Sequence, residues 1–327
     1  MKINKKLFSA PVLIILGIAL VSASIFTYLY MTTQSVTVQN SLSVNGQPVD
    51  SAVLLDSYSI FNGWEQKKSS NAYVITNVAN RNLKVTLTTP SEEGITNSYD
   101  TIGLSTKWSS NENALADAVS NGDSVTLTAN EHAVDWSDAS EARITIDAKD
   151  VGIETLNDLN SISWDANVIT GYLPHVDVFL ENGETLVFEF AKTNPLSCDV
   201  TPYPTGILNT FGTNGIVDDN AYAWESNGPS GPCDDPTFEE THNSLAEWKS
   251  QFGNVEVLRF EIETDAWISN SQSTISNIVI NGNSKIIQTL PSQLTITKDG
   301  GKQSFYVNSK FANNLVAGTY NIETTIA

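Results

Sequence analysis

The chain reads Val36-Thr-Val-Gln-Asn-Ser-Leu-Ser-Val44 and then continues with Asn45-Gly46. Side chains alternate between the two faces of an extended segment, so its apolar residues share one face. These residues are Val36, Val38, Leu42 and Val44. An Asn-Gly pair directly after such a stretch is typical of a tight hairpin turn. The stretch therefore predicts an N-terminal β-hairpin and a β-rich fold.

Comparable strand patterns recur along the whole chain, separated by turns rich in Gly and Asn. The predicted strands cover 73–76, 83–88, 124–129, 143–148, 161–164, 176–180, 185–191, 255–263, 276–280, 294–297, 304–307 and 319–326. A hairpin turn is expected at 181–184. Helices are expected only over 113–119 and 244–252, the second ended by Gly253 as a C′ glycine. Many short strands at regular spacing predict β-sandwiches.

Length and charge narrow the class of protein. The chain has 327 residues, 17 basic and 37 acidic, for a net charge of −20. This length favours two domains. The acidity excludes a nucleic-acid partner, because binding to phosphates requires Lys and Arg. The two cysteines are too few for a disulfide scaffold or a four-cysteine zinc site.

The acidic residues are concentrated in one block. Residues 116–281 hold 28 acidic and 5 basic residues, whereas 32–115 and 282–327 together hold 9 of each. The last 46 residues offer too few strands to close a sandwich alone. We therefore expect two jelly-roll or β-sandwich domains, one inserted in the other. The base domain combines 32–115 with 282–327, the inserted acidic domain is 116–281, and the ends of the insertion lie close together.

The N-terminus carries a membrane-targeting signal. Lys2, Lys5 and Lys6 precede an uncharged, largely apolar stretch over 7–31. A helix of this length would cross a bilayer, and the lysines would keep its N-terminus in the cytoplasm. The alternative is a cleaved signal peptide, because small residues follow the densest apolar part at 22–24. Both interpretations place residues 32–327 at the cell surface or outside the cell, and an uncleaved helix makes the membrane a partner.

The flanks resemble a known group of proteins. The carrying segments are Tyr73-Val-Ile-Thr-Asn-Val-Ala-Asn-Arg-Asn-Leu-Lys-Val-Thr-Leu87 and Ala317-Gly-Thr-Tyr-Asn-Ile-Glu-Thr-Thr-Ile326. Together with the apolar N-terminus, they are similar to the camelysin/TasA group of prokaryotic secreted surface and fibre proteins. The resemblance implies a jelly-roll domain whose segment 32–44 is donated as a strand to a neighbouring subunit. An ordinary edge strand in its own sheet is the alternative.

Camelysins have been regarded as metalloproteases, but this chain has no His-Glu-x-x-His motif. The acidic block resembles jelly-roll carbohydrate-binding modules in Val255-Glu-Val-Leu-Arg-Phe-Glu-Ile-Glu263 and Ile275-Ser-Asn-Ile-Val-Ile-Asn-Gly282. That likeness assigns no binding residue. Aromatic rings in or near loops can stack on sugars, and they can equally pack in the core. The stacking candidates are Trp136, Tyr172 and Trp224.

Two further features suggest stabilising sites. Oxygen-rich loops carry two acidic pairs, Asp218-Asp219 and Asp234-Asp235, which make calcium the candidate metal, with solvated loops as the alternative. No other cofactor is expected.

Cys198 and Cys233 bracket a segment rich in Pro and Gly, and they are predicted to form a disulfide in an oxidising environment. His132, His175 and His242 show no metal-binding spacing along the chain, so no zinc site is expected.

Carboxylates on the 255–263 strand raise the question of catalysis. Leu258, Phe260 and Ile262 are predicted on one face, and Arg259, Glu261 and Glu263 on the other. Paired carboxylates on a jelly-roll face could serve glycoside hydrolysis. A charged outer face, with Arg259 paired to Glu189 or Glu261 across strands, is the simpler interpretation. No residue is assigned a catalytic role.

The leading hypothesis is a non-enzymatic, exported cell-surface or filament subunit. Its candidate partners are copies of itself and a surface polysaccharide. A monomeric carbohydrate-binding adhesin and a secreted glycoside hydrolase remain open as alternatives. Filament assembly predicts that 36–44 pairs outside its own subunit, whereas a monomeric adhesin predicts that it pairs internally.

Overall fold

The structure is a computed structural model that describes most of the chain after residue 40. The described residues are 41–61, 63–107, 116–130, 139–171, 173–189, 206–208, 217–225, 242–266 and 270–327. Antiparallel strands dominate them, which confirms the prediction of an all-β, sandwich-like protein. The predicted N-terminal helix over 7–31 lies outside the described residues. Among the described helices, none has the length and apolarity to cross a membrane.

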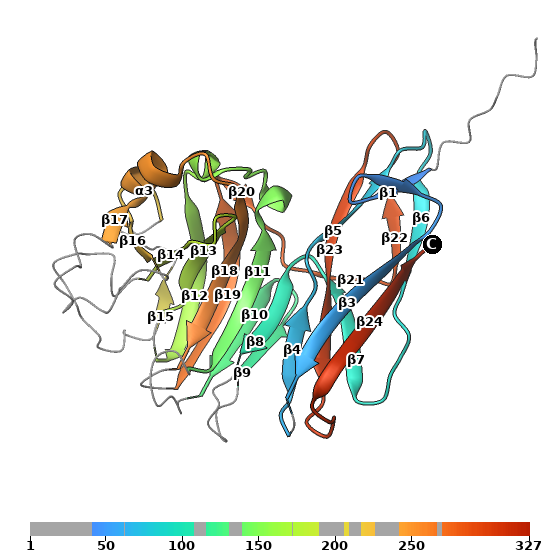
Figure 1. Cartoon of the computed structure of the whole chain (residues 1–327), viewed down its shortest axis with the longest axis horizontal. Coiled ribbons are helices and arrows are strands. Elements are labelled where there is room, and N and C mark those ends of the chain that lie inside the picture. Colours follow the sequence, from blue (N-terminus) through green and yellow to red (C-terminus); the bar gives the residue numbers. More distant parts are fainter. Residues whose placement is uncertain are drawn as a thin grey trace, which may run out of the picture. The chain divides into compact units, whose positions relative to one another are not determined.

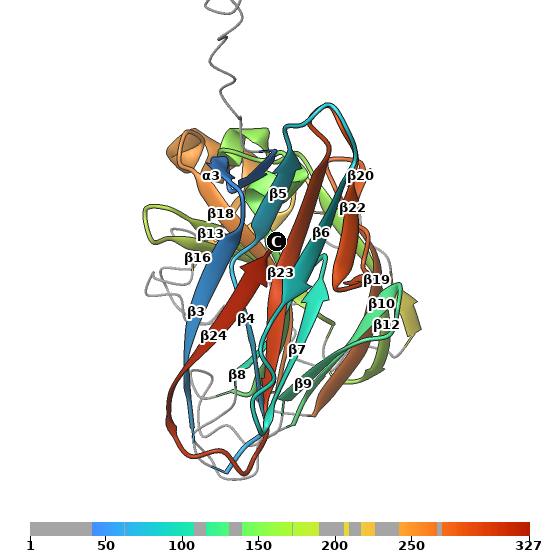
Figure 2. The same ribbon diagram turned by 90° about the vertical axis from the view of Figure 1, so that its right-hand side faces the viewer.

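Two of the four described sheets enclose a smaller core, built from both ends of the chain (Figure 1). The first sheet runs in the order β2 (Gln47–Val49), β1 (Leu42–Val44), β5 (Tyr73–Asn77), β23 (Lys302–Phe311), β7 (Ile95–Asp100) and β21 (Thr289–Leu290), with β4 (Gln66–Ser69) also on β23. The second runs β22 (Gln293–Ile296), β6 (Leu83–Thr88), β24 (Gly318–Ile326) and β3 (Ala52–Ile60). Figure 2 shows β3, β24 and β6 side by side.

Aromatic rings fill much of this smaller core. Phe305 and Phe311 on β23 are fully buried. The rings of Tyr73 and Tyr99 lie 5.7 and 6.2 Å from that of Phe305, between centroids. Such tilted and edge-on pairs stabilise a core beyond the area they bury.

The other two sheets enclose a larger core. One runs β15 (Gly206–Leu208), β12 (Ile162–Thr170), β19 (Ser271–Ile280), β10 (Ser124–Ala129) and β9 (Ala116–Ser120), with β20 (Asn283–Ser284) on β19. The other runs β17 (His242–Ser244), β16 (Tyr222–Glu225), β14 (Thr185–Phe188), β13 (His175–Leu180), β18 (Val257–Asp265), β11 (Glu141–Asp147) and β8 (Gly103–Lys107). Short 3-10 helices η3 (Ala148–Val151) and η4 (Leu156–Asp158) and the α-helix α3 (Leu245–Phe252) lie in the connections.

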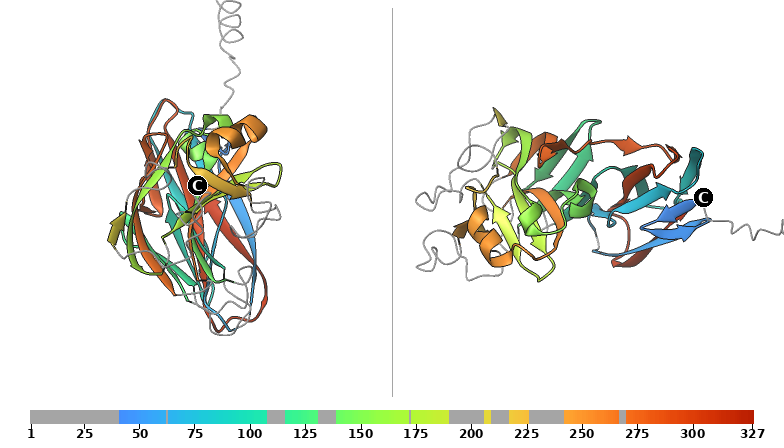
Figure 3. Two further views of the ribbon diagram at one scale, coloured as in Figure 1. Left: turned by 90° about the vertical axis from the view of Figure 1, so that its left-hand side faces the viewer. Right: turned by 90° about the horizontal axis from the view of Figure 1, so that it is seen from above.

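The chain passes between the two groups of strands at two neighbouring points. The backbone N–H of Thr101 donates to the Gln288 carbonyl at 2.9 Å, and the Thr101 hydroxyl oxygen accepts from the Gln288 N–H at the same distance. Asp100 on β7 is paired with Thr289 on β21. Strand β8, inside the segment 32–115, pairs with β11 of the larger core. The right-hand view of Figure 3 also shows the two groups of strands separately.

The predicted turns are confirmed where they are described. Asn45 and Gly46 both have positive φ angles, 49° and 79°, and connect β1 to β2. Asn281 and Gly282 do the same between β19 and β20. Two consecutive positive φ angles match the twist of the flanking strands, and Asn and Gly adopt them at the lowest cost.

The helix expected over 113–119 is wrong for the residues described. Ala116–Ser120 forms strand β9, which pairs with β10, and residues 113–115 lie outside the described part. Ala118 points into the larger core and is fully buried. Pairing with β10 therefore overrides the local helix preference of a short Ala-rich segment.

The other predicted helix is confirmed as α3, although its end differs from the expectation. Ser244 caps the N-terminus, and its hydroxyl accepts from the Glu247 N–H while the Glu247 carboxylate accepts from the Ser244 N–H. Gly253 has φ −55°, not the left-handed value of a C′ glycine. A Cβ there would collide with the Asn157 side chain and the Lys249 carbonyl, so close packing explains this glycine.

Candidate functional site

Strand β18 is a central strand whose two faces are both covered. It lies between β11 and β13, and every residue from Phe260 to Thr264 is buried. Phe260 and Ile262 enter the larger core, so Glu261 and Glu263 point to the opposite face. The carboxylates predicted for a solvated face are therefore buried, each less than a tenth exposed.

The prediction for one residue of the apolar face is wrong. Leu258 was expected beside Phe260, but it is 39% exposed. The pairing of β13 with β18 shifts by one residue here, from Phe179 opposite Arg259 to Leu180 opposite Val257. Such an irregularity adds a residue to one strand and reverses the alternation on either side of it.

Cross-strand pairing gathers charged residues on this outer face of the sheet. Glu263 is directly opposite His175 on one side and Arg143 on the other. Asp177 is directly opposite Glu261. We call the six side chains that meet here the charged cluster: Glu141, Arg143, His175, Asp177, Glu261 and Glu263.

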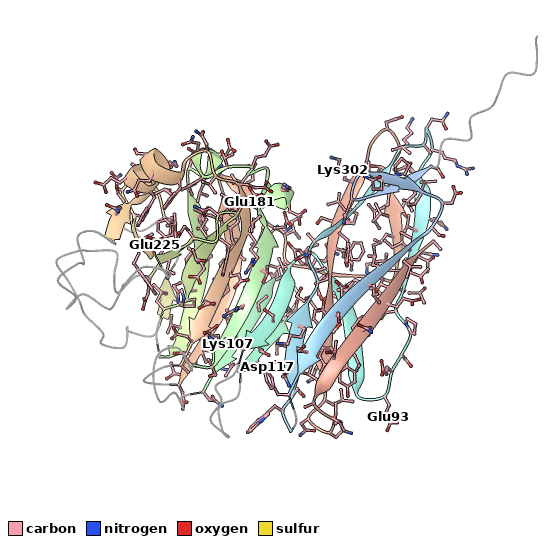
Figure 4. All side chains as sticks on the ribbon, viewed as in Figure 1. Glu93, Lys107, Asp117, Glu181, Glu225 and Lys302 are labelled. Atoms are coloured by element: carbon pink, nitrogen blue, oxygen red, sulfur yellow. The ribbon has the colours of Figure 1, made fainter. Side chains whose placement is uncertain are left out.

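Arg143 is the central cation of the charged cluster. Its Nε lies 2.9 Å from Glu263 Oε2 and its Nη1 3.3 Å from Glu261 Oε2, and its Nη2 contacts Glu141 Oε2. The other oxygen of Glu141, Oε1, accepts from Lys107 Nζ at 2.7 Å, and Lys107 is labelled in Figure 4. Three carboxylates thus share one guanidinium.

Arg259 pairs with Glu261, one of the two partners expected, but along its own strand and not across strands. Its Nε donates to Glu261 Oε1 at 2.6 Å, so the partner is Glu261 but on the same strand, two residues along. Its guanidinium carbon also lies 3.7 Å from the centre of the Phe179 ring across the strands. A cation over an aromatic face is a favourable contact, and it holds this side chain at the edge of the charged cluster.

His175 and Glu263 form a buried ion pair. His175 Nε2 lies 2.9 Å from Glu263 Oε1 and 3.7 Å from Asp177 Oδ1. Burial disfavours the charged imidazolium, but the negative charges of Glu263 and Asp177 outweigh it and raise the pKa of His175 to about 10. Burial likewise acts against the Glu263 carboxylate, yet Arg143 and His175 lower its pKa to about 2.

Among the described residues, Asp177 has a more distant ion-pair partner than the other acids of the charged cluster, with its Oδ1 3.7 Å from His175 Nε2. Burial and the neighbouring charge of Glu263 raise the pKa of its carboxyl well above the ordinary value. Its buried Oδ1 accepts no hydrogen bond from the described residues. A buried oxygen without a hydrogen bond costs free energy, and an ordered water or an ion is one of the partners that can satisfy such an atom.

The calcium candidates are only partly described. Asp218 Oδ1 accepts from the Asn220 backbone N–H at 2.9 Å, and Asp219 Oδ1 accepts from Lys249 Nζ at 2.6 Å. The first contact is a local turn and the second an ion pair at helix α3. Asp234 and Asp235 lie outside the described residues, so calcium binding stays a prediction.

The stacking and disulfide candidates are also mostly beyond the described part of the chain. Trp136, Tyr172, Cys198 and Cys233 lie outside it. Trp224 is half-buried on β16, directly opposite Val187, in the same cross-strand row as Asp177 and Glu261. Trp224 therefore lies on the same face of the sheet as the charged cluster.

The predicted assembly strand is divided. Val36 and Val38 lie outside the described residues, whereas Leu42 and Val44 are buried in β1. Strand β1 pairs with β2 and β5 of its own chain. Internal pairing of residues 42–44 is what the monomeric alternative expects, and the pairing of 32–40 stays a prediction.

Sequence reasoning missed the meeting of His175 and Asp177 with Glu263. The spacing between histidines alone does not show this site. A histidine and an aspartate two residues apart on a strand share a face, and this pattern does indicate it. The segment His175-Val-Asp177, which begins one residue before the strand predicted over 176–180, carried that signal. No local pattern could indicate Glu263, because it lies 88 residues after His175 in the sequence.

Comparisons with known proteins do not assign this site. No protein-family model matches the chain. A search of curated proteins also found no match. The function must therefore be argued from the residues and their geometry.

Proposed function

We propose that this chain is an exported, non-enzymatic cell-surface or filament subunit made of two β-sandwich domains, one inserted in the other. Segment 32–40 pairs with a neighbouring copy, while 42–44 anchor it in its own subunit. The membrane-targeting stretch 7–31 delivers the chain to the cell surface. The likeness of the flanks to the camelysin/TasA group is consistent with this role.

The two cores support the insertion. The smaller core takes residues from Leu42 to Ile95 and from Leu290 to Ile326, whereas the larger core takes only residues between Ile102 and Ile287. An inserted domain must leave and re-enter its host at neighbouring points, and the contact of Thr101 with Gln288 provides them. We therefore place the boundaries of the insertion near residues 101 and 288.

The observation that carries the proposal is the length of the strands around β1. On one side, β5 pairs up to Asn77, Val78 donates to the Ser41 carbonyl, and a bend follows at 79–81. On the other side, β2 ends at Val49, opposite Leu42. Neither described neighbour continues beyond Ser41, the residue before β1. Neither β2 nor β5 therefore provides main-chain partners for the alternating segment 32–40, and a neighbouring subunit can offer them.

Strand β3 offers a suitable acceptor edge. It pairs along all nine residues with β24, and among the described residues it is the last strand of its sheet. Val53 and Leu55 on it are 62% and 66% exposed. An uncovered edge with exposed apolar residues is a template for strand addition. Val36 and Val38 of a second copy would cover these two side chains.

The test compares two double variants of the full chain. Val36→Asp with Val38→Asp places charges on the apolar face of the segment and is expected to abolish multimers in sedimentation and electron microscopy. Thr37→Asp with Gln39→Asp adds the same charge to the opposite face and is expected to retain them. Circular dichroism should show folded protein in both. Multimers that persist in the first variant would contradict strand donation.

Leu42→Asp serves as a further control. Leu42 is buried in the smaller core, so this change is expected to unfold that core and remove multimers indirectly. The Leu42→Asp variant shows how an unfolded chain behaves in the same assays. Loss of multimers with retained folding in the Val36/Val38 variant is then specific to assembly.

The second candidate is a monomeric carbohydrate-binding adhesin, and one observation favours it. Trp224, Asp177 and Glu261 lie in one cross-strand row, which places an indole and two carboxyls on a single sheet face. An aromatic ring beside carboxylates can stack on and hydrogen-bond a sugar. Glycan binding that is lost in Trp224→Ala and retained in Trp248→Phe would support it. Release of reducing sugar would instead indicate the hydrolase alternative.

A further inference from the structure

We propose that His175, Asp177 and Glu263 bind one divalent transition-metal ion of the zinc class on the outer face of the larger core. This inference concerns the inserted domain alone and does not depend on strand donation.

The three ligands are held by rigid neighbouring strands. His175 and Asp177 are two residues apart on β13 and share a face, and Glu263 is directly opposite His175 on β18. The His175 nitrogen, one Asp177 oxygen and one Glu263 oxygen all lie within 4.8 Å of one another. Two ligands bound at about 2.1–2.2 Å to one ion lie at most about 4.4 Å apart. Small side-chain rotations therefore suffice to close the site.

A second observation, on the Asp177 carboxyl, supports a cation at this place. Asp177 Oδ1 is buried and accepts no hydrogen bond from the described residues. His175 Nε2 lies 3.7 Å from this oxygen, too far for a hydrogen bond. A metal ion bound to both atoms would satisfy this oxygen.

The surrounding charges can accept such an ion. The charged cluster contains four carboxyl groups, Glu141, Asp177, Glu261 and Glu263. In the described part of the chain, the permanent cations paired with these carboxyl groups are Arg143 within the cluster and Lys107 and Arg259 beside it. Arg143 also holds Glu263 Oε2 at 2.9 Å, which leaves Oε1 directed at His175. Partners that fix the second atom of a ligand are typical of metal sites.

The donor set indicates the class of metal. One imidazole nitrogen and two carboxylate oxygens suit zinc, manganese or iron better than calcium, which prefers oxygen alone. Three protein ligands leave one position of a tetrahedral ion for water or a ligand group. The ligand side chains remain 8 to 13% exposed, so the site is not sealed.

The experiment uses the full chain in detergent, stripped with a chelator and then titrated. Zn²⁺ is followed by calorimetry, and Co²⁺ by its visible absorption, which reports coordination geometry. We expect one ion per chain and an absorption typical of a four- or five-coordinate site. Absence of stoichiometric binding of either ion would overturn the proposal.

Matched variants locate the ion. His175→Gln and Asp177→Asn are each expected to weaken binding at least about 100-fold, because even indirect partners of a metal contribute 10–100-fold. His242→Gln and Asp219→Asn change the same residue types elsewhere and are expected to leave the affinity unchanged.

Circular dichroism checks folding, and Asp177→Asn decides the question if His175→Gln does not fold. Binding retained in both ligand variants would overturn the assignment. Loss of binding in Asp219→Asn would overturn it too, in favour of the acidic loop. Multimers are measured separately, with the Val36/Val38 variant, so failure of either proposal can be recognised on its own.

Discussion

Strand β24 in the smaller core and strand β18 in the larger core are both nine residues long, but they bury different side chains. On β24 the buried residues Ile322, Thr324 and Ile326 alternate with residues that are exposed or half-buried. On β18 burial is continuous from Phe260 to Thr264 and includes two glutamates. The first strand has one solvated face, whereas the second has none.

This difference changes what each sheet requires of its charged side chains. A sheet with a solvated outer face can leave its charges in water at no cost. A sheet that buries Glu261 and Glu263 must compensate them, because unpaired buried charges are strongly destabilising. The charged cluster is thus a set of desolvated and mutually compensating charges beside the larger core, while in the smaller core β3 is the last strand of its sheet among the described residues.

Removal of the central cation of the charged cluster should change the stability of the protein most. Arg143→Met keeps the aliphatic stem but leaves Glu141, Glu261 and Glu263 without their shared cation. We expect the free energy of unfolding to fall by roughly 3–5 kcal/mol, as when one partner of a buried pair is removed. Urea unfolding measures it. Lys149→Met, which breaks an exposed pair with Glu256, is the control and should change little. Equal effects of the two would show that the cluster is not desolvated.

A pair of identical truncations separates the two cores. Ile75 in the smaller core and Ile144 in the larger one are both fully buried. Each change to Ala should cost about 2–5 kcal/mol, through lost apolar contact and the cavity left behind. Calorimetry should show that Ile75→Ala lowers one thermal transition and Ile144→Ala another. A single transition lowered by both would mean that the cores unfold together and would count against independent domains.

A smaller effect follows from the protonation of His175 in chelator-treated protein. Because the folded pKa of about 10 exceeds the ordinary value of 6.5, the ion pair with Glu263 stabilises the fold below pH 6.5. Stability is lost as the pH rises toward 10. Between pH 7 and 9 the loss should be on the order of 2 kcal/mol, since one proton accounts for about 1.4 kcal/mol per pH unit. His175→Gln should flatten this dependence, and an unchanged slope in that variant would refute it.

Loss of the N-cap of helix α3 should change the stability of the protein least. Ser244→Ala removes the N-cap of α3 and should lower stability by about 1 kcal/mol. Ser250→Ala, in the same helix, removes only a hydroxyl bonded to the Ala246 carbonyl. It should be neutral or slightly stabilising. Both are measured by urea unfolding, and a larger loss from Ser250→Ala would show that packing, not capping, holds the helix.

Most strands could be predicted from the sequence, because alternation and turn chemistry are local properties. Strand β10 has the predicted bounds, 124–129, and Asn45-Gly46 adopts the expected turn. The candidate site was harder to find. The charged face of 255–263 was foreseen, yet its burial and its partners on β11 and β13 were not. Burial depends on what covers a face, and no segment of β18 carries that information.

The sequence by itself determined the all-β class, the positions of the hairpins and the position of α3, since each depends on residues within a few positions of one another. Only the tertiary structure decided that 116–120 is a strand, that Leu258 points outward, and that His175 and Asp177 meet Glu263. The physical reason is cross-strand register. Pairing joins segments far apart in the chain, and a shift of one residue reverses which side chains share a face.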